Sequence, residues 1–378
     1  MSDWETLFAG PHACLHRRGR FVVARLLPPH RVLSTSLRNG GQAEHLRHLV
    51  NHQSCEGAGH SDRYRAITEQ GPDGYHDAVC AELDLPARET ALMGTAANMN
   101  YLAIATEVDG SLQVTAAVTA GVQTNAACAG DPAAWREGLQ GMEKVTEGPG
   151  TINTILLVNT PVTPSALARS VVTMTEGKSA ALQRLAIPSC YSADLATGTG
   201  TDQYCVAAPR EGPRTLTSAS PHVKLGELIG LAVRKATLEA LRWQNGLEPS
   251  YTRGLFHALG RYGVRESTFF EDLSERLDPG ELELLRKNSK SVLYEPLVGA
   301  AAHALAAVLD RVRHGTLPSS VVRDAAVQQA AALAANLAAR IDRWSEFRER
   351  LQSTDGDDPK GLALAAIALG WREKWHPS

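Results

Sequence analysis

The 378-residue sequence has no excess of basic residues. Its 38 Lys and Arg are balanced by 41 Asp and Glu, which gives a net charge of −3. A protein that holds nucleic acid through phosphate contacts needs a basic face. The charge balance therefore argues against a nucleic-acid partner.

Long apolar runs and paired cysteine motifs are also missing. No stretch reaches the roughly 18 apolar residues of a membrane span, and the first residues, MSDWETLFAG, lack the pattern of a secretory signal. We therefore expect no membrane partner. Six scattered cysteines form no CxxC or CxxH spacing, so neither a zinc site nor a redox pair is indicated. Reduced thiols in a cytoplasmic protein are the expected state.

Familiar catalytic signatures are absent as well. The chain contains no GxSxG elbow, no Ser-x-x-Lys and no HExxH motif. His45, His48 and His52 would share one face if their segment were helical, but no carboxylate or cysteine motif completes a ligand set there. We expect no protein-bound metal and no required cofactor.

The chain changes character near residue 245. Before it, β-rich runs at 21–27, 31–37, 99–107, 111–120, 151–159 and 202–209 alternate with Gly- and Thr-rich loops. Asp109-Gly110 suits a tight hairpin turn, and helices are expected over 73–84, 165–185 and 224–243. Ala- and Leu-rich helical patterns follow, punctuated by Pro249, Pro279, Pro318 and Pro359.

These patterns predict an α+β or α/β layered N-terminal domain over 1–245 and an all-α extension over 246–378. The apolar helices of the extension have two readings. They pack on the core of the first domain or form the interface of a homo-oligomer.

The segment ATGTGTD (196–202) combines glycines, threonine hydroxyls and a carboxylate. It has no Lys and no following helix, so it is not a Walker loop, and it lacks the GxGxxG fingerprint of dinucleotide sites. Glycine allows a backbone to approach a ligand closely, and threonine hydroxyls both donate and accept hydrogen bonds. A ligand-binding loop and a plain turn cluster with a solvated Asp202 both fit this composition.

Two of the expected helices carry ionisable residues that are candidates for the same site as this loop. In 165–185, Lys178 fills a gap in the apolar stripe of Leu167, Val171, Met174, Leu182 and Leu185, so it must snorkel, pair or serve a site. Glu176 lies about 200° round a regular helix from it. His222 precedes the helix at 224–243, where Lys224 and Glu227 suit either a surface pair or a site.

Five ordered segments resemble the adenosylcobinamide amidohydrolase family over roughly residues 20–243. They are Thr119-Ala120-Gly121 with Asn125, Thr151–Thr154, Thr175–Lys178, Ala196–Asp202 and His222–Gly230. Asn39-Gly40-Gly41 also looks like that family. One departure is Gly177, where the family pattern leads us to expect alanine and a glycine should loosen the helix.

The resemblance implies an enzyme of corrinoid salvage and cobamide remodelling. Such an enzyme hydrolyses the amide that links a corrin-ring propionate to aminopropanol or its phosphate, and adenosylcobinamide gives adenosylcobyric acid. The partner is a corrinoid, which carries its own cobalt. A corrinoid-binding protein without hydrolysis and an amidase for another substrate are the alternatives.

The residues suggest roles for such a hydrolysis. The working hypothesis is that a carboxylate activates water, Asp202 first and Glu176 second, while Lys178 or His222 stabilises the oxyanion or protonates the amine. A threonine nucleophile from 197–201 and a metal-bound water stay open as alternatives. The candidate substrate-binding residues are Thr119, Gly121, Asn125, Thr151, Asn153, Thr197, Gly198, Thr199, Gly200, Thr201, Lys224 and Glu227.

Overall fold

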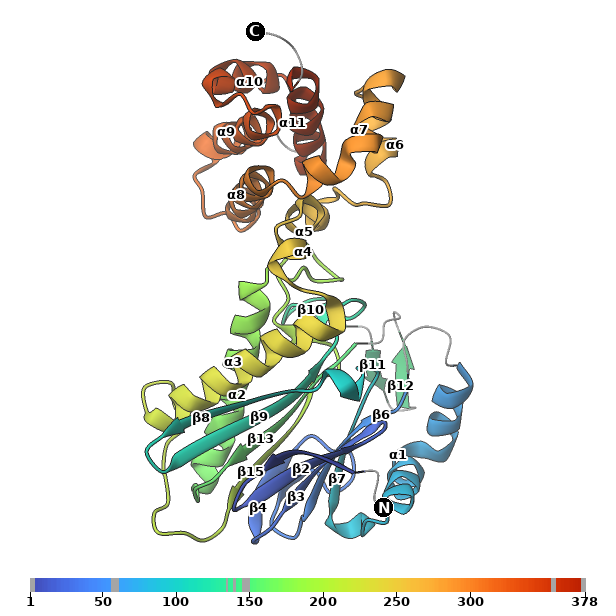
Figure 1. Cartoon of the computed structure of the whole chain (residues 1–378), viewed down its shortest axis with the longest axis vertical. Coiled ribbons are helices and arrows are strands. Elements are labelled where there is room, and N and C mark those ends of the chain that lie inside the picture. The colour runs from blue at the N-terminus through green and yellow to red at the C-terminus, as the bar shows by residue number, and fades with distance from the viewer. Residues whose placement is uncertain are drawn as a thin grey trace. The chain divides into compact units, whose positions relative to one another are not determined.

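The computed structural model describes residues 4–55, 61–133, 135–138, 141–144, 150–354 and 358–374. The chain divides into two compact units. The α/β unit comprises Met1–Tyr191 and Leu195–Leu247, and the helical unit comprises Ser192–Asp194 and Glu248–Ser378. A mixed fold with sheets followed by an all-helical segment confirms the expected fold class (Figure 1).

A six-stranded sheet with the order β5-β4-β15-β13-β9-β8 carries the candidate site of the α/β unit. Strands β13 and β15 are parallel, whereas β9 is antiparallel to β13. The β8–β9 hairpin turns at the predicted Asp109-Gly110, and Gly110 has a φ of 59°. The strands are β4 (His30–Ser34), β5 (Gly41–Ala43), β8 (Ala103–Asp109), β9 (Leu112–Ala120), β13 (Ile152–Val158) and β15 (Gln203–Pro209).

A second sheet of five strands, with the order β1-β2-β3-β6-β7, packs against the first. Only β3 of this sheet matches a strand expected from the sequence. Its strands are β1 (Glu5–Ala9), β2 (Ala13–Arg18), β3 (Phe21–Leu26), β6 (His48–Gln53) and β7 (Thr90–Thr95). Two small antiparallel pairs are β10 (Ala126–Ala127) with β14 (Gly198–Thr199) and β11 (Trp135–Gly138) with β12 (Gly141–Lys144).

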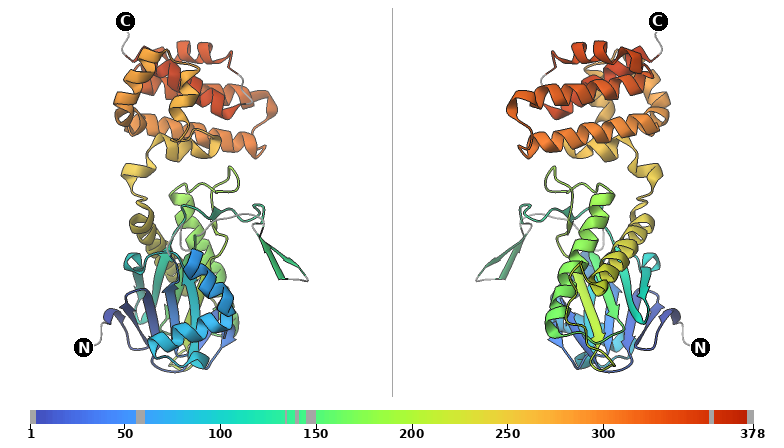
Figure 2. Two further views of the ribbon diagram at one scale, coloured as in Figure 1. Left: turned by 90° about the vertical axis from the view of Figure 1, so that its right-hand side faces the viewer. Right: turned by 90° about the vertical axis from the view of Figure 1, so that its left-hand side faces the viewer.

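Hydrophobic side chains join these elements into layers. Helix α1 (Ser61–Leu83) packs on the five-stranded sheet through Val79 and Leu83. The two sheets share a core, and helices α2 (Pro164–Arg184) and α3 (Lys224–Asn245) cover the outer face of the six-stranded sheet (Figure 1 and Figure 2, right). Burying one face of each sheet and one stripe of each helix is what makes such layers stable.

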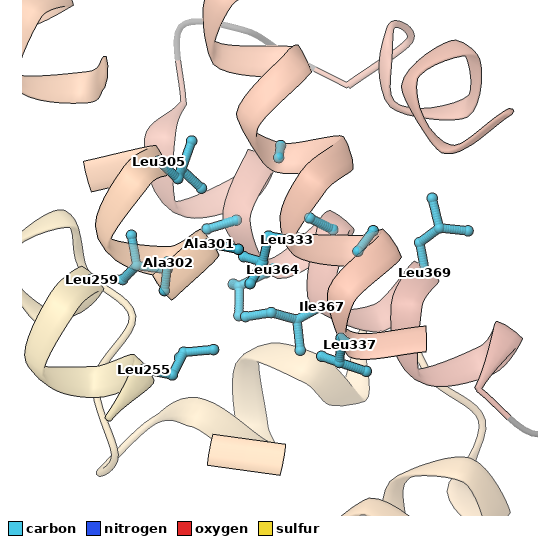
Figure 3. Packing of buried hydrophobic residues seen from close by; sticks show 14 of the residues in the cluster. Leu255, Leu259, Ala301, Ala302, Leu305, Leu333, Leu337, Leu364, Ile367 and Leu369 are labelled. Atoms are coloured by element: carbon cyan, nitrogen blue, oxygen red, sulfur yellow. The ribbon is translucent and has the colours of Figure 1, made fainter. Parts of the chain in front are cut away.

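The helical unit is built around α9 (Ser319–Ala338), which contacts α8, α10 and α11. Figure 3 shows the leucine and alanine side chains that fill its core. Prolines begin α4, α7, α8 and α11, where the missing N–H is not needed. The other helices are α4 (Pro249–Thr252), α5 (Leu255–Leu259), α6 (Phe269–Ser274), α7 (Pro279–Leu293), α8 (Pro296–Arg313), α10 (Trp344–Leu351) and α11 (Pro359–Glu373).

Small residues let helices of this unit approach closely. A Cβ atom on Gly370 of α11 would lie 2.5 Å from the carbonyl oxygen of Ala334 in α9. Within the described ranges, no single helix has the length and hydropathy of a membrane span. The bent pair α7 and α8 passes that test only jointly, across an angle of 82°.

Candidate active site

The candidate site lies where three strands of the six-stranded sheet meet one edge. Thr151 immediately precedes β13 and Asp202 immediately precedes β15, while Gly121 directly follows β9. Because β13 and β15 are parallel and β9 is antiparallel to them, all three positions fall at the same edge. In Figure 1 this region lies near β10, and segments that are distant in the sequence contribute residues to it.

Asp202 is the most heavily hydrogen-bonded group of this edge. Its Oδ1 accepts from the backbone N–H of Ile152 at 3.0 Å and from the Thr199 hydroxyl at 2.5 Å. Its Oδ2 accepts from the Thr199 backbone N–H at 3.1 Å and from the ammonium group of Lys178. The carboxylate thus joins the start of β13, the Thr–Gly loop and helix α2.

Lys178 extends from α2 to this carboxylate and forms an ion pair with Asp202. The side chains of Lys178 and Asp202 are 14% and 19% exposed, so the pair is shielded without being sealed from water. A charge-assisted hydrogen bond in such surroundings is stronger than one between neutral groups. The gap in the apolar stripe therefore marks a lysine that pairs rather than one that snorkels.

Gly198 explains why the loop needs glycine. A Cβ atom at this position would lie 2.5 Å from Asp202 Oδ2 and 2.6 Å from Lys178 Nζ. The loop backbone therefore passes directly over the ion pair, which only glycine permits without displacing it. Short pairing of β14 with β10, Thr199 opposite Ala126, holds this approach in place.

Asn125 faces the same loop from the segment after β9. Its Nδ2 donates to the Gly150 carbonyl at 2.8 Å, and its Oδ1 accepts from the Tyr191 hydroxyl at 2.7 Å. A Cβ atom on Gly200 would lie 3.2 Å from Asn125 Oδ1, so the carboxamide borders the loop. Tyr191 was not anticipated from the sequence, since it belongs to no motif. Burial, with Cys190 and Asp131 nearby, raises the pKa of its hydroxyl.

The remaining threonines of the edge are also hydrogen-bonded, to one another or to neighbouring segments. The Thr151 and Thr201 hydroxyls form a short hydrogen bond, and Thr201 also donates to the Gly150 carbonyl at 2.7 Å. The Thr197 hydroxyl accepts from the Ala129 backbone N–H at 2.9 Å, and the Thr197 carbonyl accepts from Ser179 of α2 at 2.8 Å. The segment 196–202 is thus an ordered loop around Asp202 rather than a solvated turn.

Two predicted substrate-binding residues lie beneath this edge instead of lining it. Asn153 is 0% and Thr119 is 1% exposed, and both face the five-stranded sheet. There Asn51 of β6 donates to Thr119 at 2.9 Å and accepts from Asn153 at 2.8 Å. Direct contact of Asn153 or Thr119 with a ligand does not fit this burial, so both support the site. Asn51, whose strand was not expected, is a further member of this network.

Glu176 does not join Lys178. Helix α2 runs unbroken through Gly177, contrary to the expected loosening, and Glu176 is exposed while Lys178 points to the loop. A Cβ atom on Gly177 would lie 3.0 Å from the Gly230 carbonyl oxygen of α3. Glycine at this position therefore allows α2 and α3 to pack closely, and the regular helix turns Glu176 away.

His222, Lys224 and Glu227 were expected at the site, and the structure places them elsewhere. All three are exposed, and Lys224 pairs with Glu227 at 2.8 Å. Glu227 raises the pKa of Lys224, and Asp109 in the β8–β9 turn adds to the effect. That turn lies at the far end of β9, because the six residue steps from Ile152 to Val158 span roughly 20 Å at ~3.3 Å each.

The orientation of α3 is the physical reason for this separation. Lys235 pairs with Glu107 of β8 at 2.6 Å, whereas Asn245 at the end of the helix accepts from the Val122 backbone N–H at 3.2 Å. The helix therefore runs along the strands with its last turn toward the site and its first turn away from it. A catalytic role for His222 beside Asp202 is not consistent with this arrangement.

Metal ligation was considered for His45, His48 and His52 on the condition that they were helical. His48 and His52 instead lie in strand β6. Within the residues that the structure describes, no group of three or more His, Cys, Asp or Glu side chains is placed to hold a metal ion.

The fold defines a protein with a layered α/β unit and a helical unit. The α/β unit carries a shielded lysine–aspartate–threonine cluster at one edge of its six-stranded sheet. The family model of adenosylcobinamide amidohydrolase matches residues 9–249, and the chain belongs to that family. The match contains every residue of the cluster. The expected family is thereby confirmed.

Two further similarities are more limited. An uncharacterized protein of Methanocaldococcus jannaschii is 36% identical over 183 residues, which cover 46% of this chain and 71% of that relative. A crystal structure of a protein from Pyrococcus horikoshii OT3 is similar over 63% of this chain and 83% of that one. Its identity is 12% and its TM-score 0.28, too low to support an argument about fold or function.

Proposed function

We propose that this protein hydrolyses the amide that links a corrin-ring propionate to aminopropanol, or its phosphate, in adenosylcobinamide. The products would be adenosylcobyric acid and the free amine, for corrinoid salvage. The observation that carries the proposal is the family match over residues 9–249, within which Lys178, Asp202 and Thr199 form one cluster. Residues 250–378 of the helical unit lie outside the match, and no role is proposed for them.

The chemistry of the cluster supports amide hydrolysis. This reaction needs a nucleophile, a group that stabilises the oxyanion and a proton for the leaving amine. Lys178 supplies a positive charge with N–H donors, and Asp202 and Thr199 supply an acceptor and a hydroxyl in mutual contact. The substrate carries many amide groups, which suit neighbours such as Asn125, Thr201 and the backbone of Gly200.

The test is a product assay. The purified protein is incubated with adenosylcobinamide, and adenosylcobyric acid and aminopropanol are separated by chromatography and identified by mass. We expect both products in equal amounts from the wild-type protein, and both to form about 10²- to 10³-fold more slowly with Lys178→Met. Binding of the corrinoid without product would favour a carrier, and cleavage of simple amides but not corrinoids would favour another amidase.

A further inference from the structure

The hydrogen bonds of Asp202 bear on which group attacks the amide. A carboxylate offers about four lone-pair sites. Within the described part of the chain, four donors already approach Asp202: the Lys178 ammonium, the N–H groups of Ile152 and Thr199, and the Thr199 hydroxyl. An attacking water would have to displace one of them before Asp202 could accept its proton.

One of the four donors, the Thr199 hydroxyl, is of a kind that serves as a nucleophile when a base activates it. The Thr199 hydroxyl donates to Asp202 Oδ1 at 2.5 Å, so its proton is already directed at a base. The neighbouring hydroxyls are used differently: Thr201 pairs with Thr151 and donates to the Gly150 carbonyl, and Thr197 accepts from the Ala129 N–H. A backbone carbonyl accepts a hydrogen bond, but unlike a carboxylate it is not a base that removes the proton of a hydroxyl group.

From this geometry we propose that Thr199 is the nucleophile and that hydrolysis passes through an ester on its side chain. The proposal rests on the proposed amide hydrolysis and deepens it. Asp202 is the base that accepts the Thr199 proton, and Lys178 stabilises the oxyanion. Thr199 is half-buried.

The steps balance without an added cofactor. Thr199 Oγ1 forms a bond to the amide carbon, its proton passes to Asp202, and the negative charge on the carbonyl oxygen faces the Lys178 ammonium. The C–N bond then breaks as Asp202 returns the proton to the nitrogen, and the amine leaves. Water next adds to the ester carbon while Asp202 accepts its proton. The C–O bond to Thr199 Oγ1 then breaks, Asp202 returns the proton to Oγ1, and the acid leaves.

Lys178 suits the role given to it. An ammonium group has three N–H donors, and one of them is directed at Asp202. The others can turn toward a carbonyl oxygen brought next to Thr199, because the side chain ends in a rotatable group. Gly198 keeps the loop backbone against the ion pair. Lys178 and Thr199 thereby bind the two oxygens of one carboxylate, Lys178 at Oδ2 and Thr199 at Oδ1.

The experiment traps the ester. Wild-type protein is mixed with adenosylcobinamide in single-turnover amounts, quenched in acid, digested and analysed by mass, and a parallel reaction contains hydroxylamine. We expect a corrinoid adduct on the peptide containing Thr199, and with hydroxylamine a corrinoid hydroxamate. Thr199→Val should lower turnover by at least ~10³-fold and abolish both species, as expected for loss of a catalytic nucleophile.

Two variants control for folding. Thr199→Ser keeps a hydroxyl and should retain measurable turnover with the adduct on the same peptide, while Thr106→Val on the exposed part of β8 should behave as wild type. Turnover by Thr199→Val within tenfold of wild type, or wild-type turnover without adduct and hydroxamate, would overturn the nucleophile and leave the proposed function intact. Failure of the wild-type protein to release any product would overturn the proposed function itself.

Discussion

Each of the two units contains an aspartate that accepts from a cation and from a hydroxyl group. In the α/β unit these are Asp202, Lys178 and Thr199. In the helical unit Asp310 of α8 accepts from Arg261 and from the Tyr262 hydroxyl. The side chains of Arg261 and Asp310 are 6% and 16% exposed, against 14% and 19% for the first pair. Burial alone therefore does not separate the two clusters.

The chemistry of the partners does separate them. Arg261 directs two nitrogens at the two oxygens of Asp310, and its Nη2 lies 2.7 Å from Oδ2. Such a planar fork is always charged and holds one geometry. Burial, followed by the bond to Asp310, raises the pKa of Tyr262, so its hydroxyl keeps its proton. We therefore interpret the Asp310 cluster as structural. In the α/β unit, by contrast, a lysine beside a threonine leaves N–H donors and a hydroxyl group that can act on a ligand.

The comparison is tested most severely by removing the cation of the α/β unit. Lys178→Met should lower turnover by about 10²- to 10³-fold, the loss typical for removal of one oxyanion donor. The measurement is the rate of adenosylcobyric acid formation, with circular dichroism to verify folding. A rate within fivefold of wild type would show that Lys178 is structural, like Arg261.

Removing the carboxylate of the helical unit should instead affect stability. Asp310→Asn removes the carboxylate that is hydrogen-bonded to Arg261 and should lower the free energy of unfolding by about 3–5 kcal/mol, as for a buried pair broken on one side. Thermal and urea denaturation measure this, and the turnover of the folded protein should not change. A loss of turnover in fully folded Asp310→Asn would contradict the contrast drawn between the two clusters.

The stability that the Arg261–Asp310 pair contributes should also depend on pH. Burial tends to raise the pKa of Asp310, but the hydrogen bonds from Arg261 and Tyr262 outweigh it and hold that pKa below its usual range. A depressed folded pKa means that the pair stabilises the protein above the unfolded value of about 4 and loses this contribution as the pH falls through the folded pKa. When the pH is lowered from roughly 5 to roughly 3, Asp310→Asn should therefore lose less unfolding free energy than the wild-type protein loses.

A smaller effect is expected for the tyrosine that holds Asn125. Tyr191→Phe removes the hydrogen bond to Asn125 Oδ1, and such a bond contributes about 1 kcal/mol. We expect kcat/KM to fall by roughly 3- to 10-fold, and Asn125→Ala to lose at least as much. If Asn125→Ala is impaired and Tyr191→Phe is not, Asn125 is positioned without Tyr191.

The smallest effect is expected at His222. Because the first turn of α3 lies at the end of the sheet away from Asp202, His222→Ala should change turnover by less than about twofold, as is usual for exposed side chains away from a site. A loss above tenfold would contradict the orientation of α3 relative to the reacting groups.

Local patterns predicted much of the six-stranded sheet and its helices. The helices expected at 165–185 and 224–243 are α2 and α3, and the strands expected at 151–159 and 202–209 are β13 and β15. By contrast, β1, β2, β6 and β7 were not expected. Tyr191 and Asn51 were missed for a similar reason, since each gains its role from residues more than 60 positions away in the sequence.

The sequence by itself determined α2, α3 and much of the six-stranded sheet, the place of Lys178 in the apolar stripe of its helix, and where glycine interrupts the threonines. These properties depend on neighbours within a few residues, so periodicity and composition report them. Only the tertiary structure decided that Lys178, Asp202, Thr199 and Asn125 meet while Glu176 and His222 do not. That choice follows from the rotation of α2 and the direction of α3 across the sheet, which are set by packing between distant segments.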